Sequence, residues 1–330
     1  MIRHAHVMLL LCGLLGSLHA QDRLVTLSTV KARPLALGGA YTAFEDGLTA
    51  LAFNPAGYQA GIGDFSRHLS VDFNTMAPLV FIRNRGGYNK WDAVGGLLFH
   101  GLGFSWGRIQ IGLIWGDESM ADISRLERTN WFNADGFSEN HNSTLGFSVA
   151  LAPRVRIGMV ADLYHRSRER SDLRKLGYRY GVILQPRPSL KVGLCFVDLP
   201  DDFSDERKTL ERFADESLNI GVAYTPWQPV TIALDFRNVS GENLDVSREP
   251  HIGIEIAPVN KIFLRSGYYR SQRGEVRVFS MGLGYVTSSG HSGDDRFFFH
   301  PHFELHASLL WQEDNGINSR WLVLTGVFQI

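Results

Sequence analysis

The residues best suited to chemistry form a histidine-rich run near the C-terminus, "FHPHFELH". His300, His302, Glu304 and His306 alternate with other residues, so on a strand they would share one face. Imidazole and carboxylate groups are ligands for zinc or copper. Same-face residues on a straight strand lie about 6.6 Å apart, which is too far for one ion to bind more than two of them. We therefore predict polar residues lining a wet interior, with a weak metal site at His302, Glu304 and His306 as the alternative.

No other pattern supports catalysis or a cofactor. The chain has no GxSxG sequence of the kind that forms a nucleophile elbow. Its glycine pairs, such as Gly86 and Gly87, lack the strand, loop and helix context of a phosphate-binding loop. The 33 basic and 34 acidic residues nearly balance, which argues against nucleic acid as a partner. We predict that the protein is not an enzyme, binds no cofactor and binds no nucleic acid.

The first twenty residues have the layout of a secretory signal peptide. A basic start precedes the apolar run "VMLLLCGLLG", and small residues lead to Ala20. The run is shorter than the roughly 20 residues that a spanning helix needs. We predict an exported protein whose leader comprises residues 1–20 and whose mature chain begins near Gln21. Loss of the leader leaves Cys195 as the only cysteine, so no intramolecular disulfide is expected.

Most of the chain has the period-two pattern of strands. In "TIALDFRNV", Ile232, Leu234 and Phe236 fall on one face, whereas Asp235 and Arg237 fall on the other. The segments "LGFSVAL", "NIGVAYT" and "HIGIEIA" repeat this arrangement. One face of each predicted strand is therefore bulky and apolar, and the other is small or polar.

Short turns and long loops alternate between these strands. Pro153, Pro186, Pro226 and Pro258 each follow one strand and precede the next by a few residues, where a fixed φ suits a tight turn. The connections at the other strand ends are longer and charged, as in "PDDFSDERKTLERFADE". This order predicts an up-and-down antiparallel sheet with one short-turn edge and one long-loop edge.

Two architectures fit the alternation: a soluble barrel or sandwich with the apolar face inside, and a membrane barrel with that face toward lipid. Segments such as "RIGMVADLYH" match the 9 to 11 residues of a tilted membrane strand, and aromatic residues such as Trp227 and Tyr285 gather near strand ends. The 34 glycines and 12% aromatic residues fit a wall one residue thick without a conventional core. We favour an all-β transmembrane barrel of about 14 strands over residues 61–330, in contact with lipid of the outer membrane.

The segment that precedes the strands is "ARPLALGGAYTAFEDGLTALAFNPAGY". It resembles the N-terminal signature of the FadL-like outer-membrane superfamily, and most closely that of its PorV/PorQ-type branch. The shared features are a small-residue GGA turn, an acidic residue before a short Ala-rich helix, and then NPAG. The resemblance implies a barrel of about 14 strands with an N-terminal plug, here residues 21–60, that contains a short helix. Carried over by position, the plug residues are Gly38, Gly39, Asp46, Asn54, Pro55, Ala56 and Gly57.

The resemblance implies two functions. FadL-type barrels take up hydrophobic molecules, which predicts a channel for hydrophobic small molecules gated by the plug. PorV-type barrels serve protein secretion, which predicts instead an adaptor of a type IX-like machine, with secretion-machine proteins as partners. In a third interpretation the segment only caps one end of the barrel and does not gate it. The polar inward faces of the predicted strands disfavour a continuous apolar path along the whole lumen. They leave these alternatives open.

Overall fold

The computed structural model describes residues 23–24, 32–59, 68–72, 101–117, 140–168, 171–198, 216–237, 239, 249–270, 277–287, 302–314 and 317–329. The predicted leader and His300 lie outside the described residues, and the predicted plug limits of 21–60 extend slightly beyond them. We call residues 32–59 the plug.

Three short helices lie in the plug, and strands make up nearly all of the rest. The helices are α2 (Ala32–Ala36) and the 3₁₀ helices η1 (Leu48–Ala52) and η2 (Pro55–Gly57). The strands are β1 (Arg23–Leu24), β2 (His68–Asp72), β3 (Gly101–Trp106), β4 (Ile109–Asp117), β5 (Asn140–Ala152), β6 (Val155–Arg168), β7 (Ser171–Arg187), β8 (Leu190–Asp198), β9 (Glu216–Trp227), β10 (Val230–Arg237), β11 (Glu249–Val259), β12 (Ile262–Arg270), β13 (Arg277–Thr287), β14 (His302–Asp314) and β15 (Ile317–Gln329). No helix in the described part of the chain is long and apolar enough to cross a membrane.

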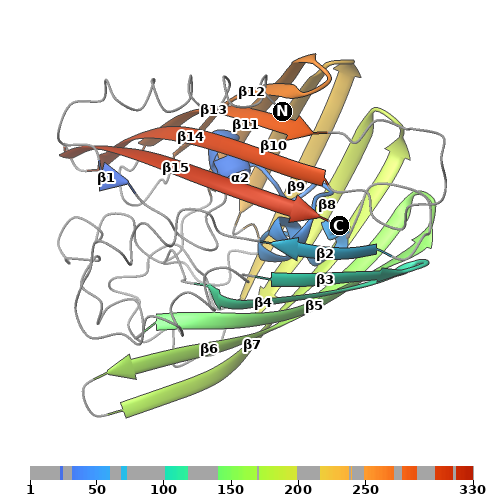
Figure 1. Ribbon diagram of the computed structural model, residues 1–330, viewed down its shortest axis with the longest axis vertical. Coiled ribbons are helices and arrows are strands. Elements are labelled where there is room, and N and C mark those ends of the chain that lie inside the picture. The colour runs from blue at the N-terminus through green and yellow to red at the C-terminus, as the bar shows by residue number, and fades with distance from the viewer. Residues whose placement is uncertain are drawn as a thin grey trace, which may run out of the picture.

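Fourteen of the described strands, β2 to β15, form one closed antiparallel ring around the plug (Figure 1). Each strand pairs with its neighbours in the chain, and β15 returns to β2 with Phe328 opposite Val71 and Gln329 opposite Ser70. The two-residue strand β1 pairs with β15 in parallel. A closed ring satisfies the backbone hydrogen bonds without a free sheet edge, as a bilayer requires. The predicted up-and-down barrel of about 14 strands is confirmed.

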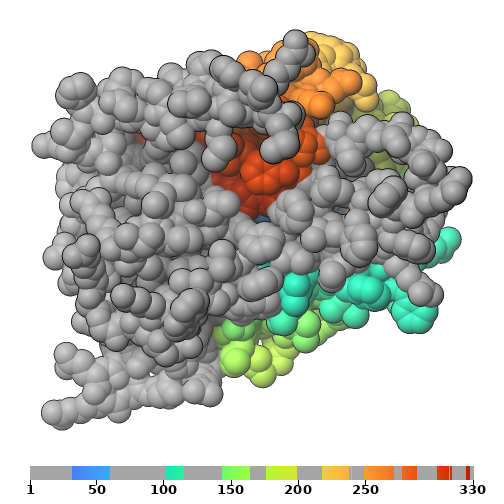
Figure 2. Space-filling view, viewed as in Figure 1, coloured from blue at the N-terminus to red at the C-terminus, as the bar shows by residue number. Residues whose placement is uncertain are grey.

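Exposure alternates along the strands in the sense expected of a membrane barrel. In β3, Leu102, Phe104 and Trp106 are exposed, whereas Ser105 between them is buried. The exposed side chains of residues 101–114 form part of the outer surface in Figure 2, where they are turquoise. A soluble barrel would bury these apolar side chains, so the exposed apolar outer wall has the pattern of a membrane barrel.

A buried core lies between the plug and the barrel wall. In one cluster, Leu48, Leu51 and Tyr58 of the plug pack with Ile114 of β4 and Val160 of β6. These wall residues point inward, so the plug fills the space that an empty barrel would leave to water. The prediction of a wall one residue thick without a conventional core is therefore wrong where the plug contacts the wall, because the plug supplies a second packing layer.

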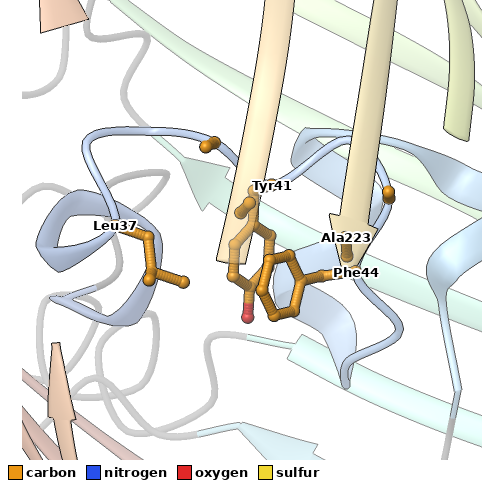
Figure 3. Close-up of a cluster of buried hydrophobic side chains, with 7 residues drawn as sticks. Leu37, Tyr41, Phe44 and Ala223 are labelled. Atoms are coloured by element: carbon orange, nitrogen blue, oxygen red, sulfur yellow. The ribbon is translucent and has the colours of Figure 1, made fainter. Parts of the chain in front are cut away.

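The second cluster is built around two stacked rings of the plug (Figure 3). The rings of Tyr41 and Phe44 are stacked with their centroids 4.8 Å apart. Leu37 lies in the same cluster, and the small side chains of Ala223 and Ala233 complete it from β9 and β10. Small wall residues leave room for large plug residues, which is why the aromatic groups come from the plug side.

Candidate functional site: the plug and its contacts with the barrel wall

The GGA motif ends the first plug helix. The Gly39 amide donates to the Pro34 carbonyl at 2.8 Å and closes the last turn of α2. Gly38 and Gly39 have φ angles of 62° and 79°, in the left-handed region that glycine adopts without strain. This is a common ending for helices. The glycines turn the chain toward Tyr41 and place both of their carbonyl oxygens against the barrel wall.

The NPAG motif begins the last plug helix. The Asn54 side chain caps η2 by accepting a hydrogen bond from the Ala56 amide at 3.1 Å. Pro55 occupies the first turn, where its missing amide hydrogen costs nothing. The Asp46 amide donates to the Gly57 carbonyl at 2.9 Å, so the acidic residue is held beside the motif. The predicted short helix after Asp46 is η1, a 3₁₀ helix.

A belt of small residues lines the wall at the level of the plug. The small-residue belt consists of Gly112, Gly146, Gly158, Gly181, Gly193, Gly221, Ala233, Gly253, Gly267 and Gly282, on the ten consecutive strands β4 to β13. A Cβ atom at Gly181 would lie 2.0 Å from Asn54 Oδ1, and one at Gly267 would lie 2.0 Å from the Gly38 nitrogen. Such distances are far below van der Waals contact. The plug therefore occupies the volume that side chains would otherwise fill.

Asn54 connects both halves of the plug to the wall. Its Nδ2 donates to the Thr42 carbonyl at 2.7 Å and to the Val182 carbonyl of β7 at 3.2 Å. Its Oδ1 accepts from the Ala56 amide, so the donors and the acceptor are all engaged. The residue is fully buried. An amide is needed here because one end must donate and the other must accept.

Replacing Asn54 with aspartate tests this arrangement. Asn54→Asp keeps the shape but turns a carboxylate oxygen toward the Thr42 and Val182 carbonyls. A buried charge would then face two acceptors, and we expect plug docking to weaken by about 3 kcal/mol or more. Proteinase K should cleave the plug faster in detergent, while Asn260→Asp, in an exposed turn, should leave the rate unchanged. Equal protection of both variants would contradict the assigned role of Asn54.

Asp235 of β10 holds the other half of the plug. Its Oδ2 accepts hydrogen bonds from the amides of Tyr41 and Thr42, both at 2.8 Å, and from Thr42 Oγ1 at 2.7 Å. On the same strand, Arg237 Nη2 donates to the Gly39 carbonyl at 2.5 Å. The carboxylate is buried, and bonds to an ionised acceptor are among the stronger ones in proteins.

Arg156 of β6 anchors the end of the plug. Its Nε donates to the Ala56 carbonyl at 3.1 Å, and its Nη2 donates to the Tyr58 carbonyl at 2.9 Å. Ser148 of β5 also donates to the Ala56 carbonyl, and the Tyr58 hydroxyl donates to the Ile111 carbonyl of β4. The end of the plug is therefore tied to three adjacent strands through its own carbonyl oxygens and one phenol.

A chain of charges joins the start of the plug to β11 and β12. Arg33 makes two hydrogen bonds of 3.2 Å with Glu255, and Arg265 donates to the same carboxylate at 2.6 Å. Arg33 also lies 3.4 Å from Asp46, whose carboxylate accepts a hydrogen bond from the Tyr41 hydroxyl. Charges taken out of water need partners of opposite sign, and in this row of side chains each charge has a neighbour of the opposite sign.

Two residues of the predicted metal site, Glu304 and His306, belong to this charge network. Glu304 and His306 are joined at 2.8 Å, and His306 Nδ1 lies 3.2 Å from an Arg265 nitrogen. The side chain of His302 lies outside the described set. No group of three or more His, Cys, Asp or Glu side chains in the described ranges could hold a metal ion. The Arg265 guanidinium beside His306 adds a positive charge that disfavours a cation there.

The phenol of Tyr41 responds to the same environment. Burial raises the pKa of Tyr41 well above its ordinary value, the Arg33 guanidinium acts in the opposite direction, and the Asp46 carboxylate adds to the rise. The docked plug therefore keeps this proton at a pH where an exposed tyrosine would lose it.

Alkaline pH is accordingly expected to release the plug. An undocked Tyr41 ionises near pH 10. Because its pKa is raised in the docked state, the contribution of Tyr41 is fully present below about pH 10 and is lost as the pH rises through the docked value. Protection of the plug from proteinase K should fall more steeply above about pH 10 in the wild type than in Tyr41→Phe. Parallel loss in both proteins would show that another group titrates.

No protein-family model and no curated protein matches the sequence of the chain. Among solved structures, the Ralstonia pickettii toluene transporter TbuX is similar over 92% of this chain and 97% of its own, with 13% identity and a TM-score of 0.50. The Pseudomonas putida toluene transporter TodX is similar over 94% and 99%, with 14% identity and a TM-score of 0.50. The chain has the fold of these transporters. A Pseudomonas aeruginosa FadL homologue is similar over 94% and 98%, with 9% identity and a TM-score of 0.48.

Within this fold, the predicted plug residues lie in two places. Gly38 and Gly39 lie against β11 and β12, where His251 Nδ1 is 2.6 Å from the Gly38 oxygen. Asn54 and the residues that follow it lie against β5, β6 and β7. Asp46 is paired with Arg33 and forms a β-bridge with Tyr58. The structure thus brings all of them into one plug, and a gating role for them stays a prediction.

Several residues of the site were missed from the sequence. Asp235 and Arg156 were not singled out, although each stands on the small or polar face of its predicted strand. The small-residue belt was also missed, although nearly every strand has a glycine near its middle, as in "RIGMV", "KVGLC", "NIGVA" and "HIGIE". A glycine recurring on the inward face of successive strands is the signal that another part of the chain approaches the wall closely.

Proposed function

We propose that the chain is an outer-membrane barrel of the FadL-like superfamily that lets small hydrophobic molecules pass, with the plug as its gate. The fold that it shares with two toluene transporters supports this proposal, as does the apolar outer wall. By analogy with what those proteins carry, a monoaromatic hydrocarbon such as toluene is the substrate class to test. The function requires no catalytic residue and no cofactor.

The observation that carries the proposal is how the plug is attached. Contacts between the plug and the wall run through side chains such as Asp235, Asn54 and Arg156. The one isolated β-bridge described within residues 32–59 is internal, between Asp46 and Tyr58. The only ladder described between the N-terminal segment and the wall is the two-residue pairing of β1 with β15, before the plug. Side-chain hydrogen bonds can exchange with water one at a time, whereas a β-ladder must be unzipped as a unit. A plug held in this way can leave the lumen while the wall stays closed.

The test compares the full mature chain with a version that lacks residues 21–60. Both are refolded into vesicles, and the entry of radiolabelled toluene and the conductance in planar bilayers are measured. We expect the truncated barrel to conduct continuously and the full chain to conduct little. Asp235→Ala should lie between the two, because it loosens the plug without removing it. Equal flux and conductance in all three would contradict gating by the plug.

A secretion adaptor of the PorV type is the second candidate. The observation that favours it is the number of attachments, since plug bonds reach β4, β5, β6, β7, β8, β10, β11, β13 and β15. So many contacts suit a barrel that remains closed and serves as a platform. If intact and truncated barrels are equally closed and empty, cross-linking from the long loops to secretion proteins becomes the decisive measurement.

A further inference from the structure

Five described short turns at one end of the barrel carry charge of one sign. The five short turns described there comprise residues 107–108, 153–154, 188–189, 228–229 and 260–261. With the strand ends that flank them they carry Arg108, Arg154, Arg187 and Lys261, all exposed, and no Asp or Glu. Because consecutive hairpins stand side by side in the ring, these four charges are spread around the rim. We call them the basic rim.

Exposed apolar side chains adjoin the basic rim. Trp106 and Trp227, at the ends of β3 and β9, are each 64% exposed, and Leu151 and Val259 are 53% and 54% exposed. Indole rings concentrate where hydrocarbon meets the headgroups of a bilayer. The basic rim is therefore continuous with the lipid-facing wall and lies at the depth where phosphate groups begin.

Two of the rim arginines are oriented along the perimeter. Arg108 donates to the Leu151 carbonyl and Arg154 donates to the Pro186 carbonyl, each at 3.4 Å, so each arginine reaches toward the next hairpin. Within the described ranges, Arg154, Arg187 and Lys261 form no ion pair with an acidic side chain. A guanidinium has five N–H donors, so one carbonyl contact leaves Arg154 able to bind a phosphate oxygen.

At the opposite end of the barrel, one described cation has an acidic neighbour. There Arg277 of β13 lies 3.8 Å from Glu313 of β14, and both side chains are about half exposed. The charge of Arg277 is therefore partly neutralised within the protein, so this residue suits a control.

We propose that the basic rim binds the headgroups of anionic phospholipids, of the phosphatidylglycerol type, in the leaflet at the short-turn end. This inference rests on the proposed placement of the barrel in a membrane. A compact patch would suit a folded protein partner, whereas single cations spaced around a ring match a layer of headgroups that surrounds the barrel. Basic residues near a bilayer surface each strengthen attraction to anionic lipid about fivefold.

The experiment measures which lipids the barrel retains. The full mature chain is reconstituted in an equal mixture of phosphatidylglycerol and phosphatidylethanolamine, extracted gently, and analysed by native mass spectrometry. The test variant combines Arg108→Gln, Arg154→Gln, Arg187→Gln and Lys261→Gln. Two double variants are also compared. The rim pair combines Arg108→Gln and Arg154→Gln, and the opposite-end pair combines Arg270→Gln and Arg277→Gln.

We expect the wild type to retain phosphatidylglycerol in preference to phosphatidylethanolamine. In the fourfold variant, the ratio of the two retained lipids should be lower by about tenfold or more. The rim pair should lose more of it than the opposite-end pair, and added salt should weaken it in the wild type. Retention of both lipids without preference, or a preference unchanged in the fourfold variant, would overturn the inference and leave the transport proposal standing. Failure of the wild type to enter bilayers at all would overturn both.

Discussion

Gly267→Val is expected to expel the plug from a barrel that still forms. A Cβ atom at Gly267 would lie 2.0 Å from the Gly38 nitrogen and 2.2 Å from the Leu37 carbonyl carbon. Both are backbone atoms, which cannot move aside as a flexible side chain can. Extra bulk in a packed interior costs about 1 to 3 kcal/mol, and more where the backbone is the obstacle. The wall itself should tolerate the change, since valine favours strands.

Three measurements separate an expelled plug from a failed fold. The heat-modifiable band on a gel should persist, which reports an intact barrel, while the plug becomes sensitive to proteinase K and conductance rises. Leu264→Val is the matched control, because it introduces the same residue into the same strand on the exposed outward face. A Gly267→Val protein with a protected plug and a closed lumen would contradict the close packing of the small-residue belt.

Asp235→Ala is expected to open the middle of the plug locally. The change removes one acceptor from the Tyr41 amide, the Thr42 amide and the Thr42 hydroxyl together. Hydrogen bonds to a charged group contribute about 1.5 to 3 kcal/mol each, and part of that loss is recovered by water. We expect a net loss of about 3 kcal/mol in docking, or about a hundredfold faster amide exchange at Tyr41 and Thr42.

Hydrogen exchange followed by mass spectrometry on peptides covering residues 37–44 checks this result. Asp235→Asn keeps one acceptor oxygen and should give an intermediate rate. Asp162→Asn is the control, since that buried carboxylate bonds to Arg179 and Thr144 on neighbouring strands. Slow exchange in Asp235→Ala, equal to that of the wild type, would mean that other contacts hold this part of the plug.

The barrel was predictable because its information is local and repeated. Period-two alternation in segments such as 231–239 sets both the strand and the face that meets lipid, and each short turn after a proline sets the next pairing. Fourteen similar strands repeat this signal, so an error in one leaves the architecture unchanged. The turn at Gly38 and Gly39 and the helix start at Asn54 were local in the same way, because each depends on the conformation of a few consecutive residues.

The contacts of the plug could not be read in this way. Asp235 meets Tyr41 across 194 positions, and Arg33 meets Glu255 across 222, so no local pattern links them. The polar inward faces of the strands predicted a water-filled lumen. Residues such as Ser148 and Asp235 are nevertheless buried, because the plug excludes water from them. The sequence by itself determined the strands, their lipid-facing side and the plug motifs. Only the tertiary structure decided which polar groups are paired, since pairing depends on how a separate segment fills the closed ring.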